Sequence, residues 1–197
     1  MARFRSSTAP FGGVPACALP EGGRNLQKEK RMNDKRNTFK RIRAEADEIF
    51  ARSGGTRKKL AALCALLSGS VDYYDWVGFY IVCGEKRLAL GPFVGAPTEH
   101  VEIPFGTGIC GQAAASGRTI VIQDVSKVTN YLSCAPEVTS EIVVPIYSEG
   151  IIVGELDIDS HDLSPFSYED LELLEHICRR LSEQWDIEIE EKALCAD

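Results

Sequence analysis

Two different hydrophobic periods run along this chain, and the change from one to the other divides it into helical and strand segments. Apolar residues recur at helical spacing from Phe39 to Arg52, and a second helix is expected from Thr56 to Leu67. From Trp76 onward the period changes to two, which predicts strands. Another long helix is expected from Ser167, with Asp170 at the capping-box position.

The strand-like segments predict two hairpins and two shorter strands. The hairpins are Trp76 to Val82 with Arg87 to Val94, and Glu141 to Tyr147 with Ile151 to Asp159; the short strands lie at Val101 to Ile103 and Thr119 to Gln123, and a brief helix at Gln112 to Ser116. Helices at both ends of a largely antiparallel sheet give an α+β fold. A chain of 197 residues has room for one well-packed domain plus tails.

The N-terminal segment differs in composition from the rest. Residues 1–31 contain three prolines and no sustained periodicity, so we expect a disordered extension, followed by a domain at 32–190 and an acidic tail at 191–197. Because the helical pattern begins just after Met32, translation could start there in nature. The alternative is a targeting peptide, although the prolines would interrupt the amphipathic helix that such a peptide needs.

Charge and cysteine usage narrow the functional classes. The net charge is −7, with +8 on the first 43 residues and −15 on the remainder, so the acidic body would repel nucleic acid. The longest apolar run has eight residues, Leu60 to Leu67, whereas a membrane span needs about twenty. Seven cysteines without a CxxC pair suit a reducing cytosol, which predicts a cytoplasmic protein.

The segment Gly106 to Gly111 matches GxGxxG, the pattern of dinucleotide-binding loops. Its context argues against that function, because Pro104 precedes the motif and Gly117 ends the following helix within two turns. Two interpretations stay open: a small anion-binding site made of backbone N–H groups, or a tight turn without a ligand.

Asp157 and Asp159 lie on one face of a predicted strand, and the register of the hairpin decides whether Glu141 joins them. A two-residue turn at Glu149–Gly150 would turn Glu141 away, whereas a three-residue loop over 148–150 sets it opposite Asp157. We expect the three-residue loop. Three clustered acids would then form a cation site, and the alternative is a solvated outer face.

Two further groups of residues could hold a ligand. Trp76, Gly78 and Tyr80 share a face, and Gly78 would leave room between the two rings for a small molecule, unless the rings are ordinary core. The two aspartates together with His161 could be metal ligands, but no second cluster supplies the missing ligands, so no metal is expected.

Two cysteines are candidates for thiol chemistry. Cys134 lies in a predicted loop, whereas a structural cysteine is more common in an apolar strand or helix, so an exposed and reactive thiol is expected. Cys110 lies at the start of the short helix, where the helix dipole should favour its thiolate.

Six motifs in order resemble the free methionine-(R)-sulfoxide reductases, which are built on a GAF domain. They are WVGFY, LALGPFVG, IPFGTGICG, the step from Cys134 to Glu141, SEIVVPI and GELDIDS, and the match runs from about Phe39 to Leu181. The resemblance implies an antiparallel GAF sheet, a homodimer through the terminal helices and no bound cofactor. It places the catalytic cysteine at Cys134, the helix-start cysteine at Cys110, the substrate-binding acids at Glu141, Asp157 and Asp159, and aromatic contacts at Trp76 and Tyr80.

The sequence departs from this family at one place. Members that form an internal disulfide usually carry a third cysteine between GPFxG and IPxG, but Ala96 to Glu102 contains none and has His100 near that position. Either Cys110 resolves the oxidised Cys134, or an external thiol such as thioredoxin attacks it directly.

The resemblance predicts an activity, and two other functions compete with it. The predicted activity is thiol-dependent reduction of free methionine (R)-sulfoxide to methionine through a cysteine sulfenic acid. The alternatives are a GAF module that binds a small ligand without chemistry and a thiol redox sensor without substrate. The short segment after Leu181 has no room for an output domain, which favours the enzyme.

Overall fold

The computed structural model describes residues 21–129, 131–132 and 136–185. The chain forms two compact units, residues 1–35 and 36–197. The first contains the start of helix α1 (Glu21–Ala51), which begins within the segment 1–31 for which the sequence predicts disorder. Residues 21–35 are rich in Glu, Lys, Arg and Gln, which have high helix propensity but give no apolar stripe for pattern reading to detect.

The second unit is an α+β domain built on one antiparallel sheet, as the sequence predicts. Its strands lie in the order β3-β2-β1-β6-β5-β4, and each neighbouring pair is antiparallel. The strands are β1 (Trp76–Val82), β2 (Arg87–Val94), β3 (Glu102–Pro104), β4 (Ile120–Ile122), β5 (Ser140–Ser148) and β6 (Ile151–Ser160). The remaining helices are α2 (Thr56–Ser70), α3 (Gly108–Ser116) and α4 (Tyr168–Ser182), with a short 3-10 turn at Val125–Lys127.

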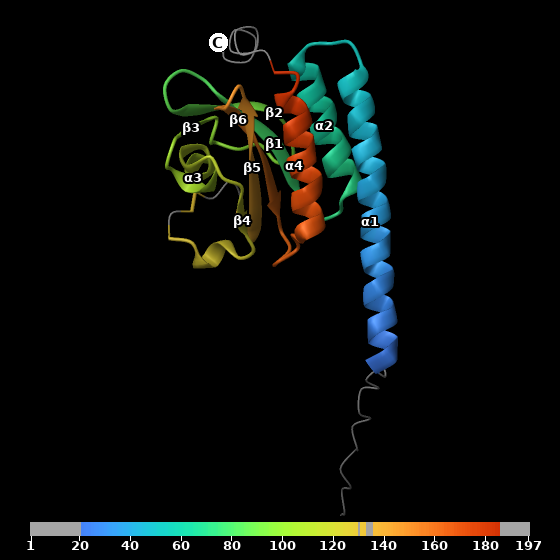
Figure 1. The fold of residues 1–197 in the computed structure, drawn as a ribbon. Helices are drawn as coiled ribbons and strands as arrows, with labels where there is room; N and C mark the ends of the chain where they lie inside the picture. The colour runs from blue at the N-terminus through green and yellow to red at the C-terminus, as the bar shows by residue number, and fades with distance from the viewer. Residues whose placement is uncertain (1–20, 130, 133–135, 186–197) are drawn as a thin grey trace, which may run out of the picture. The chain divides into compact units, whose positions relative to one another are not determined.

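Helices cover both faces of the sheet (Figure 1). Residues 36–51 of α1, together with α2 and α4, pack on one face over a large apolar core that includes Phe79, Ile142 and Leu156. On the opposite face the short α3 packs against β5 and β6, over a smaller core that includes Tyr80, Cys110 and Val143. Alternate residues of each strand therefore belong to two separate cores.

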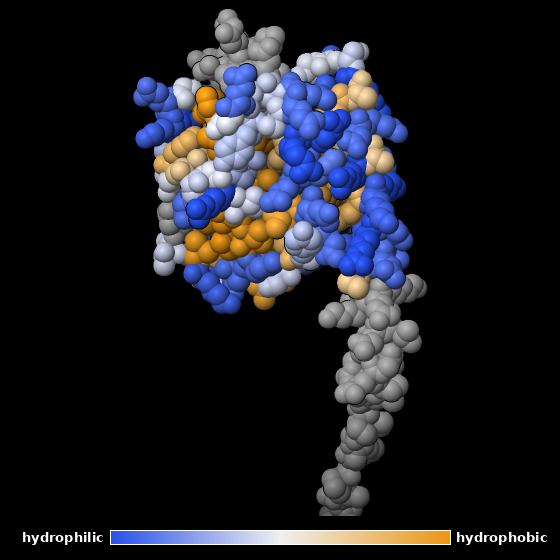
Figure 2. All heavy atoms as spheres, viewed as in Figure 1, coloured by the Kyte–Doolittle hydropathy of each residue, from blue (hydrophilic) through white to orange (hydrophobic). Residues whose placement is uncertain are grey.

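The last helix begins with the predicted capping box. The backbone N–H of Ser167 donates to Asp170 Oδ2 at 2.6 Å, and the hydroxyls of Tyr73 and Tyr74 donate to Asp170 Oδ1 at 2.6 and 3.0 Å. This buried carboxylate therefore joins the start of α4 to the segment before β1. In Figure 2 the outward surface of α1 and α4 on this face is mostly hydrophilic, as expected for helices that cover a sheet.

No helix in the described part of the chain is both long and apolar enough to cross a membrane.

Candidate active site

Four carboxyl groups lie side by side on the face of the sheet that α3 covers. Glu155, Asp157 and Asp159 alternate along β6, and Glu141 on β5 is paired with Asp159. Each of the four residues is at most 2% exposed. Because β6 is flanked by β1 and β5, these acids lie in the middle of the sheet, not on a solvated outer face.

The predicted hairpin loop is wrong, although the predicted face of Glu141 is confirmed. The turn at Glu149–Gly150 has two residues, and both have positive φ, 50° and 81°, as in type I′ hairpins. An irregularity between Ile146 and Tyr147 then shifts the register by one residue. Glu141 consequently lies opposite Asp159 instead of Asp157, and the shift keeps all three acids on one face.

Glu155 is a fourth acid that the sequence reasoning missed. Its side chain is completely buried, and its strand partner on β1 is Tyr80. The signal was present, because Glu-Leu-Asp-Ile-Asp continues the alternation of acid and apolar residues by one more step.

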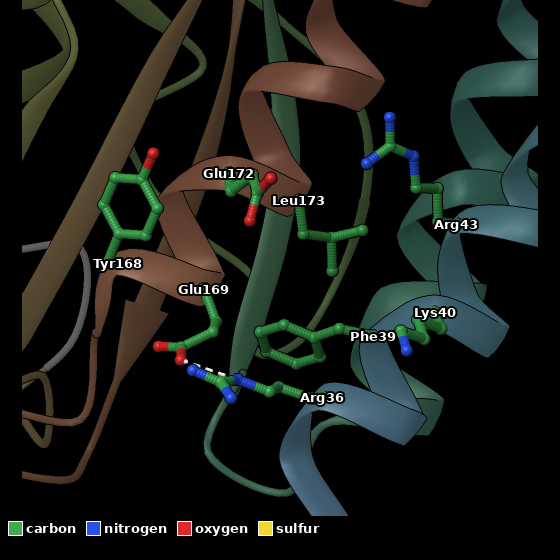
Figure 3. A pocket seen from close by; sticks show the side chains of 8 residues that line it. All are labelled: Arg36, Phe39, Lys40, Arg43, Tyr168, Glu169, Glu172 and Leu173. Atoms are coloured by element: carbon green, nitrogen blue, oxygen red, sulfur yellow. Dashed lines mark hydrogen bonds and ion pairs between the residues drawn. The ribbon is translucent and has the colours of Figure 1, made fainter. Parts of the chain in front are cut away.

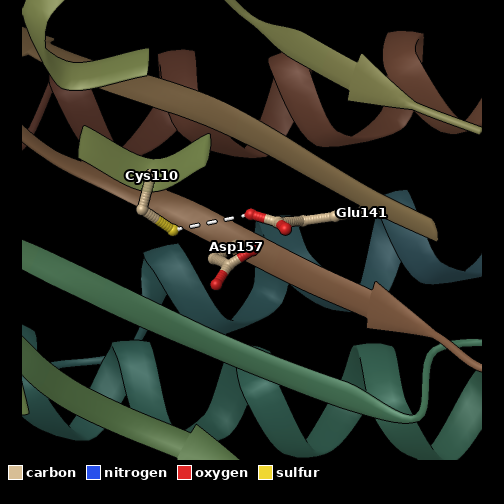
Figure 4. Close-up of side chains that lie close together, drawn as sticks. All are labelled: Cys110, Glu141 and Asp157. Atoms are coloured by element: carbon tan, nitrogen blue, oxygen red, sulfur yellow. Dashed lines mark hydrogen bonds between the residues drawn. The ribbon is translucent and has the colours of Figure 1, made fainter. Parts of the chain in front are cut away.

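Cys110 brings a thiol into contact with the acids. Helix α3 directs its side chain toward the sheet, where Sγ lies 3.8 Å from Oε1 of Glu141 and donates to it (Figure 4). Three residues, Cys110, Glu141 and Asp157, each offer one side-chain atom that could bind a metal. These three atoms all lie within 4.8 Å of one another. Cys110 does lie in the first turn of α3, as predicted, but its sulfur faces carboxylates, which oppose the effect of the helix dipole on a thiolate.

Burial has the largest effect on the pKa values of the four acids, and the interaction with the Cys110 thiol offsets only part of it. Neither carboxylate oxygen of Glu155, Asp157 or Asp159 accepts a hydrogen bond of ordinary geometry within the described residues. Burial raises the pKa of Asp157 to about 7. Burial, followed by the negative charge of Asp157, also raises the pKa values of Glu141, Glu155 and Asp159 well above their usual range. These shifts favour protonated carboxyl groups near neutral pH.

Trp76 and Tyr80 border the acids, but the predicted gap between them does not exist. A Cβ added at Gly78 would come within 2.1 Å of the Trp76 ring, so the indole itself fills the space over this glycine. Trp76 Nε1 donates to the carbonyl of Ala96 at 3.1 Å, and the Tyr80 hydroxyl donates to the carbonyl of His100 at 2.9 Å. The two rings therefore fix the connection between β2 and β3 beside the acids.

The glycine-rich segment before α3 makes a tight turn. The N–H of Gly106 donates to Gly111 O at 2.6 Å, and the N–H of Thr107 donates to Pro104 O at 3.1 Å. These two amides are therefore not available to an anion. A Cβ at Gly111 would lie 2.4 Å from Pro104 O, so close backbone contact requires glycine here.

His161, which the sequence offers as a possible metal ligand with the two aspartates but which we did not expect to bind one, lies apart from the acid cluster. His161 follows the end of β6, and its Nδ1 lies 3.5 Å from Asp75 Oδ1 in a partly exposed pair. Among the described residues, the group that could ligate a metal is Cys110 with Glu141 and Asp157.

A hollow lies on the opposite side of the sheet from the acids, between α1 and α4 (Figure 3). It has a volume of about 390 Å³, and an exposed ion pair joins Arg36 Nε to Glu169 Oε1 at 3.3 Å beside it. Its lining residues are Arg36, Phe39, Lys40, Arg43, Tyr168, Glu169, Glu172 and Leu173. The charged side chains of this hollow are in contact with water, and two of them form an ion pair. It therefore differs from the α3 side of the sheet, where the acids are buried and have no cationic partner among the described residues.

Comparisons with known proteins agree with this architecture. The GAF domain family model matches residues 56–185, the part of the chain that holds the four acids and Cys110. The free methionine-R-sulfoxide reductase of Escherichia coli is 37% identical over 122 residues, which are 62% of this chain and 73% of that protein. The chain belongs to the GAF family of free methionine-R-sulfoxide reductases.

Solved structures show the same family likeness. The free methionine-R-sulfoxide reductase of Neisseria meningitidis, in complex with its substrate, is 33% identical, with a TM-score of 0.72 over 79% of this chain and 92% of that one. A protein from Burkholderia vietnamiensis described as a putative GAF sensor is 32% identical, with a TM-score of 0.71 over 76% of this chain and 94% of that one. These comparisons confirm the expected GAF fold. The family to which the chain belongs consists of oxidoreductases.

Cys134, which the sequence analysis predicts as the catalytic cysteine, lies outside the described residues. Among the described cysteines, Cys64 and Cys178 are buried thiols of the core on the other face, and burial raises the pKa of Cys64 to about 12. Cys83 is disulfide-bonded, which departs from the fully reduced set expected from the sequence. Cys110 is therefore the described thiol that lies among the acids.

Proposed function

We propose that this chain reduces free methionine (R)-sulfoxide to methionine and that the buried acids hold the ammonium group of this substrate. The single observation that carries the proposal is the set of buried carboxylates without a cationic partner. None of the ion pairs among the described residues involves Glu141, Glu155, Asp157 or Asp159. Such a cluster is costly to bury unless a positive charge enters it.

An α-amino acid supplies that charge in a compact form. Its ammonium group has three N–H donors, which match the unsatisfied oxygens of Asp157 and Asp159. The raised pKa values of the acids would fall toward their ordinary range once the ammonium group is bound. A methionine sulfoxide inside a peptide has no ammonium group, so it would leave the carboxyl groups unpaired.

The proposed first step is attack by the thiolate of Cys134 on the sulfoxide sulfur. The S–S bond that this attack forms breaks again while the oxygen, carrying one added proton, leaves the substrate sulfur and bonds to the cysteine sulfur, so the products are methionine and a cysteine sulfenic acid. The substrate sulfur is thereby reduced by two electrons and the cysteine sulfur is oxidised by two.

The proton for that step can come from the acid cluster. Burial raises the pKa of Asp157 to about 7, so a large fraction of this carboxyl group is protonated at neutral pH before the ammonium group binds. Burial and the neighbouring negative charges act in the same direction on Glu141. One protonated carboxyl group can therefore donate to the sulfoxide oxygen while the others bind the ammonium group.

The sulfenic acid must be reduced by a second thiol. That thiol attacks the sulfenic sulfur, water leaves, and a disulfide forms. Cys110 is one candidate, and its position beside Glu141 supports a location close to the substrate. The other is an external reductant such as thioredoxin.

We further propose that the protein works as a cytoplasmic homodimer that pairs through its terminal helices.

An NADPH-coupled assay with thioredoxin and thioredoxin reductase tests the activity. We expect NADPH oxidation that depends on both the full chain and free methionine (R)-sulfoxide, with no bound cofactor added. The second candidate function is ligand sensing, which the likeness to the putative GAF sensor of Burkholderia vietnamiensis favours. Saturable binding of methionine sulfoxide with no NADPH oxidation in the thioredoxin system, and with no methionine formed when a small dithiol is the reductant, would support the sensor and overturn the enzyme.

A further inference from the structure

The group of Cys110, Glu141 and Asp157 has the dimensions of a metal site. In a tetrahedral zinc site, bond lengths near 2.3 Å to sulfur and 2.0–2.2 Å to oxygen place neighbouring S and O ligands about 3.5 Å apart. Here Sγ of Cys110 and Oε1 of Glu141 are 3.8 Å apart, and the three ligand atoms all lie within 4.8 Å of one another. Small side-chain rotations would bring them into coordination distance.

The carboxylate of Asp157 points into this group, where the Cys110 thiol and the backbone N–H of Ile158 are the neighbouring donors. The residue is completely buried, and neither of its oxygens accepts a hydrogen bond of ordinary geometry within the described residues. The same is true of Glu155, which adjoins Asp157 on the same strand. Buried carboxylates without such hydrogen bonds are stabilised by a cation, and a divalent cation offsets more of their charge than an ammonium group does.

The mixture of donor atoms selects the class of cation. One sulfur and two carboxylate oxygens suit borderline-soft ions such as Zn²⁺ better than Mg²⁺ or Ca²⁺, which prefer all-oxygen sites. Three protein ligands also leave a coordination position that water can fill.

We propose that Cys110, Glu141 and Asp157 form a binding site for a thiophilic divalent cation of the Zn²⁺ class. The Cys110 thiol loses its proton to solvent when the metal–sulfur bond forms, and the sulfur is neither oxidised nor reduced. The bound cation occupies the carboxylates that the proposed substrate needs. Zn²⁺ is therefore a competitive inhibitor, a consequence that rests on the proposed function, whereas the binding itself does not.

Cd²⁺ is the spectroscopic probe, because its thiolate complexes absorb in the ultraviolet. The reduced full-length chain is titrated with Cd²⁺ under anaerobic conditions, and Zn²⁺ affinity is measured by competition with a chromophoric chelator. We expect a charge-transfer band that saturates at one Cd²⁺ per chain and is absent in Cys110→Ser. A band of equal intensity and affinity in Cys110→Ser would overturn the proposal.

Matched variants separate this site from the other thiols. Cys178→Ala removes a buried thiol of the opposite core and should leave the Cd²⁺ band unchanged. Asp157→Asn keeps the thiol and should weaken Zn²⁺ binding by about tenfold or more. Unchanged Zn²⁺ affinity in Asp157→Asn would contradict the site even if Cys110→Ser fails to fold, and circular dichroism identifies that case.

Substrate competition links the cation to the acids. Free methionine sulfoxide at saturating concentration should raise the apparent dissociation constant for Cd²⁺, and N-acetylmethionine sulfoxide should not. If the chain shows no reductase activity but the Cys110-dependent band is present, the proposed function fails and the metal site stands. If the chain is active and the band is absent, the metal site fails and the function stands.

Discussion

Replacing Asp157 by asparagine removes the charge of the central acid while keeping its shape. In the folded protein burial raises the pKa of Asp157 from an ordinary value of 3.8 to about 7, so the folded state binds this proton more tightly than the unfolded state does. Between these two pKa values the folded state holds more protons, and the free energy of unfolding falls as pH rises. The raised pKa therefore costs stability at neutral and alkaline pH.

The size of this effect follows from the two pKa values. Each pKa unit corresponds to about 1.4 kcal/mol, so the cost of Asp157 grows from about 1 kcal/mol at pH 4.5 to about 4 kcal/mol at pH 8. The asparagine side chain of the variant does not titrate, so Asp157→Asn should be more stable than the parent by about 4 kcal/mol at pH 8 and by only about 1 kcal/mol at pH 4.5. Part of the pH dependence should persist, because the other three acids of the cluster stay buried.

Urea unfolding at pH 4.5, 6 and 8, followed by tryptophan fluorescence and circular dichroism, measures the difference. Asp75→Asn is the control, because Asp75 is partly exposed and pairs with His161 at the end of β6. We expect the gain to be specific to Asp157→Asn, to increase with pH, and to accompany a loss of affinity for methionine sulfoxide. An Asp157→Asn variant that is less stable than the parent at pH 8 would refute the reasoning.

Four other predictions follow from the site. Glu155→Gln should weaken binding of free methionine sulfoxide by about tenfold in calorimetry, because one charge beside the ammonium group is lost; unchanged affinity would remove Glu155 from the site. Gly78→Ala should destabilise the chain by about 1–3 kcal/mol and shift tryptophan fluorescence, because its Cβ displaces the Trp76 ring; an unchanged melt would argue against that packing. Cys134→Ser should abolish turnover while retaining substrate binding, and an active variant would exclude it as the nucleophile. Sedimentation equilibrium should give twice the chain mass, and a monomer at all concentrations would exclude the dimer.

Strand periodicity predicted most of the sheet because every second residue of a central strand enters the same core. Both hairpins and the face of Asp157 and Asp159 came directly from that alternation. The length of the loop before β6 could not be predicted in this way. A two-residue turn with a register shift after Ile146 puts Glu141 on the same face of the sheet as the predicted three-residue loop does. Local sequence does not distinguish these two solutions.

Contacts between distant segments were harder to predict. The position of Cys110 against Glu141 depends on how α3 folds back over β5, which no local pattern encodes. The filled space over Gly78 depends on the rotamer of Trp76, and pattern reading gave a gap where the structure has an indole ring. The start of α1 was missed because residues 21–35 have helix propensity without an apolar stripe.

The most direct measurement compares kcat/KM for free methionine (R)-sulfoxide and its N-acetyl derivative in the thioredoxin-coupled assay. N-acetylation removes the positive charge and leaves the sulfoxide intact, which should cost about 1–3 kcal/mol, or about 5- to 150-fold in kcat/KM. Glu141→Gln should narrow that ratio by lowering activity on the free amino acid alone. Equal kcat/KM values for the two substrates would contradict recognition of the ammonium group by the buried acids.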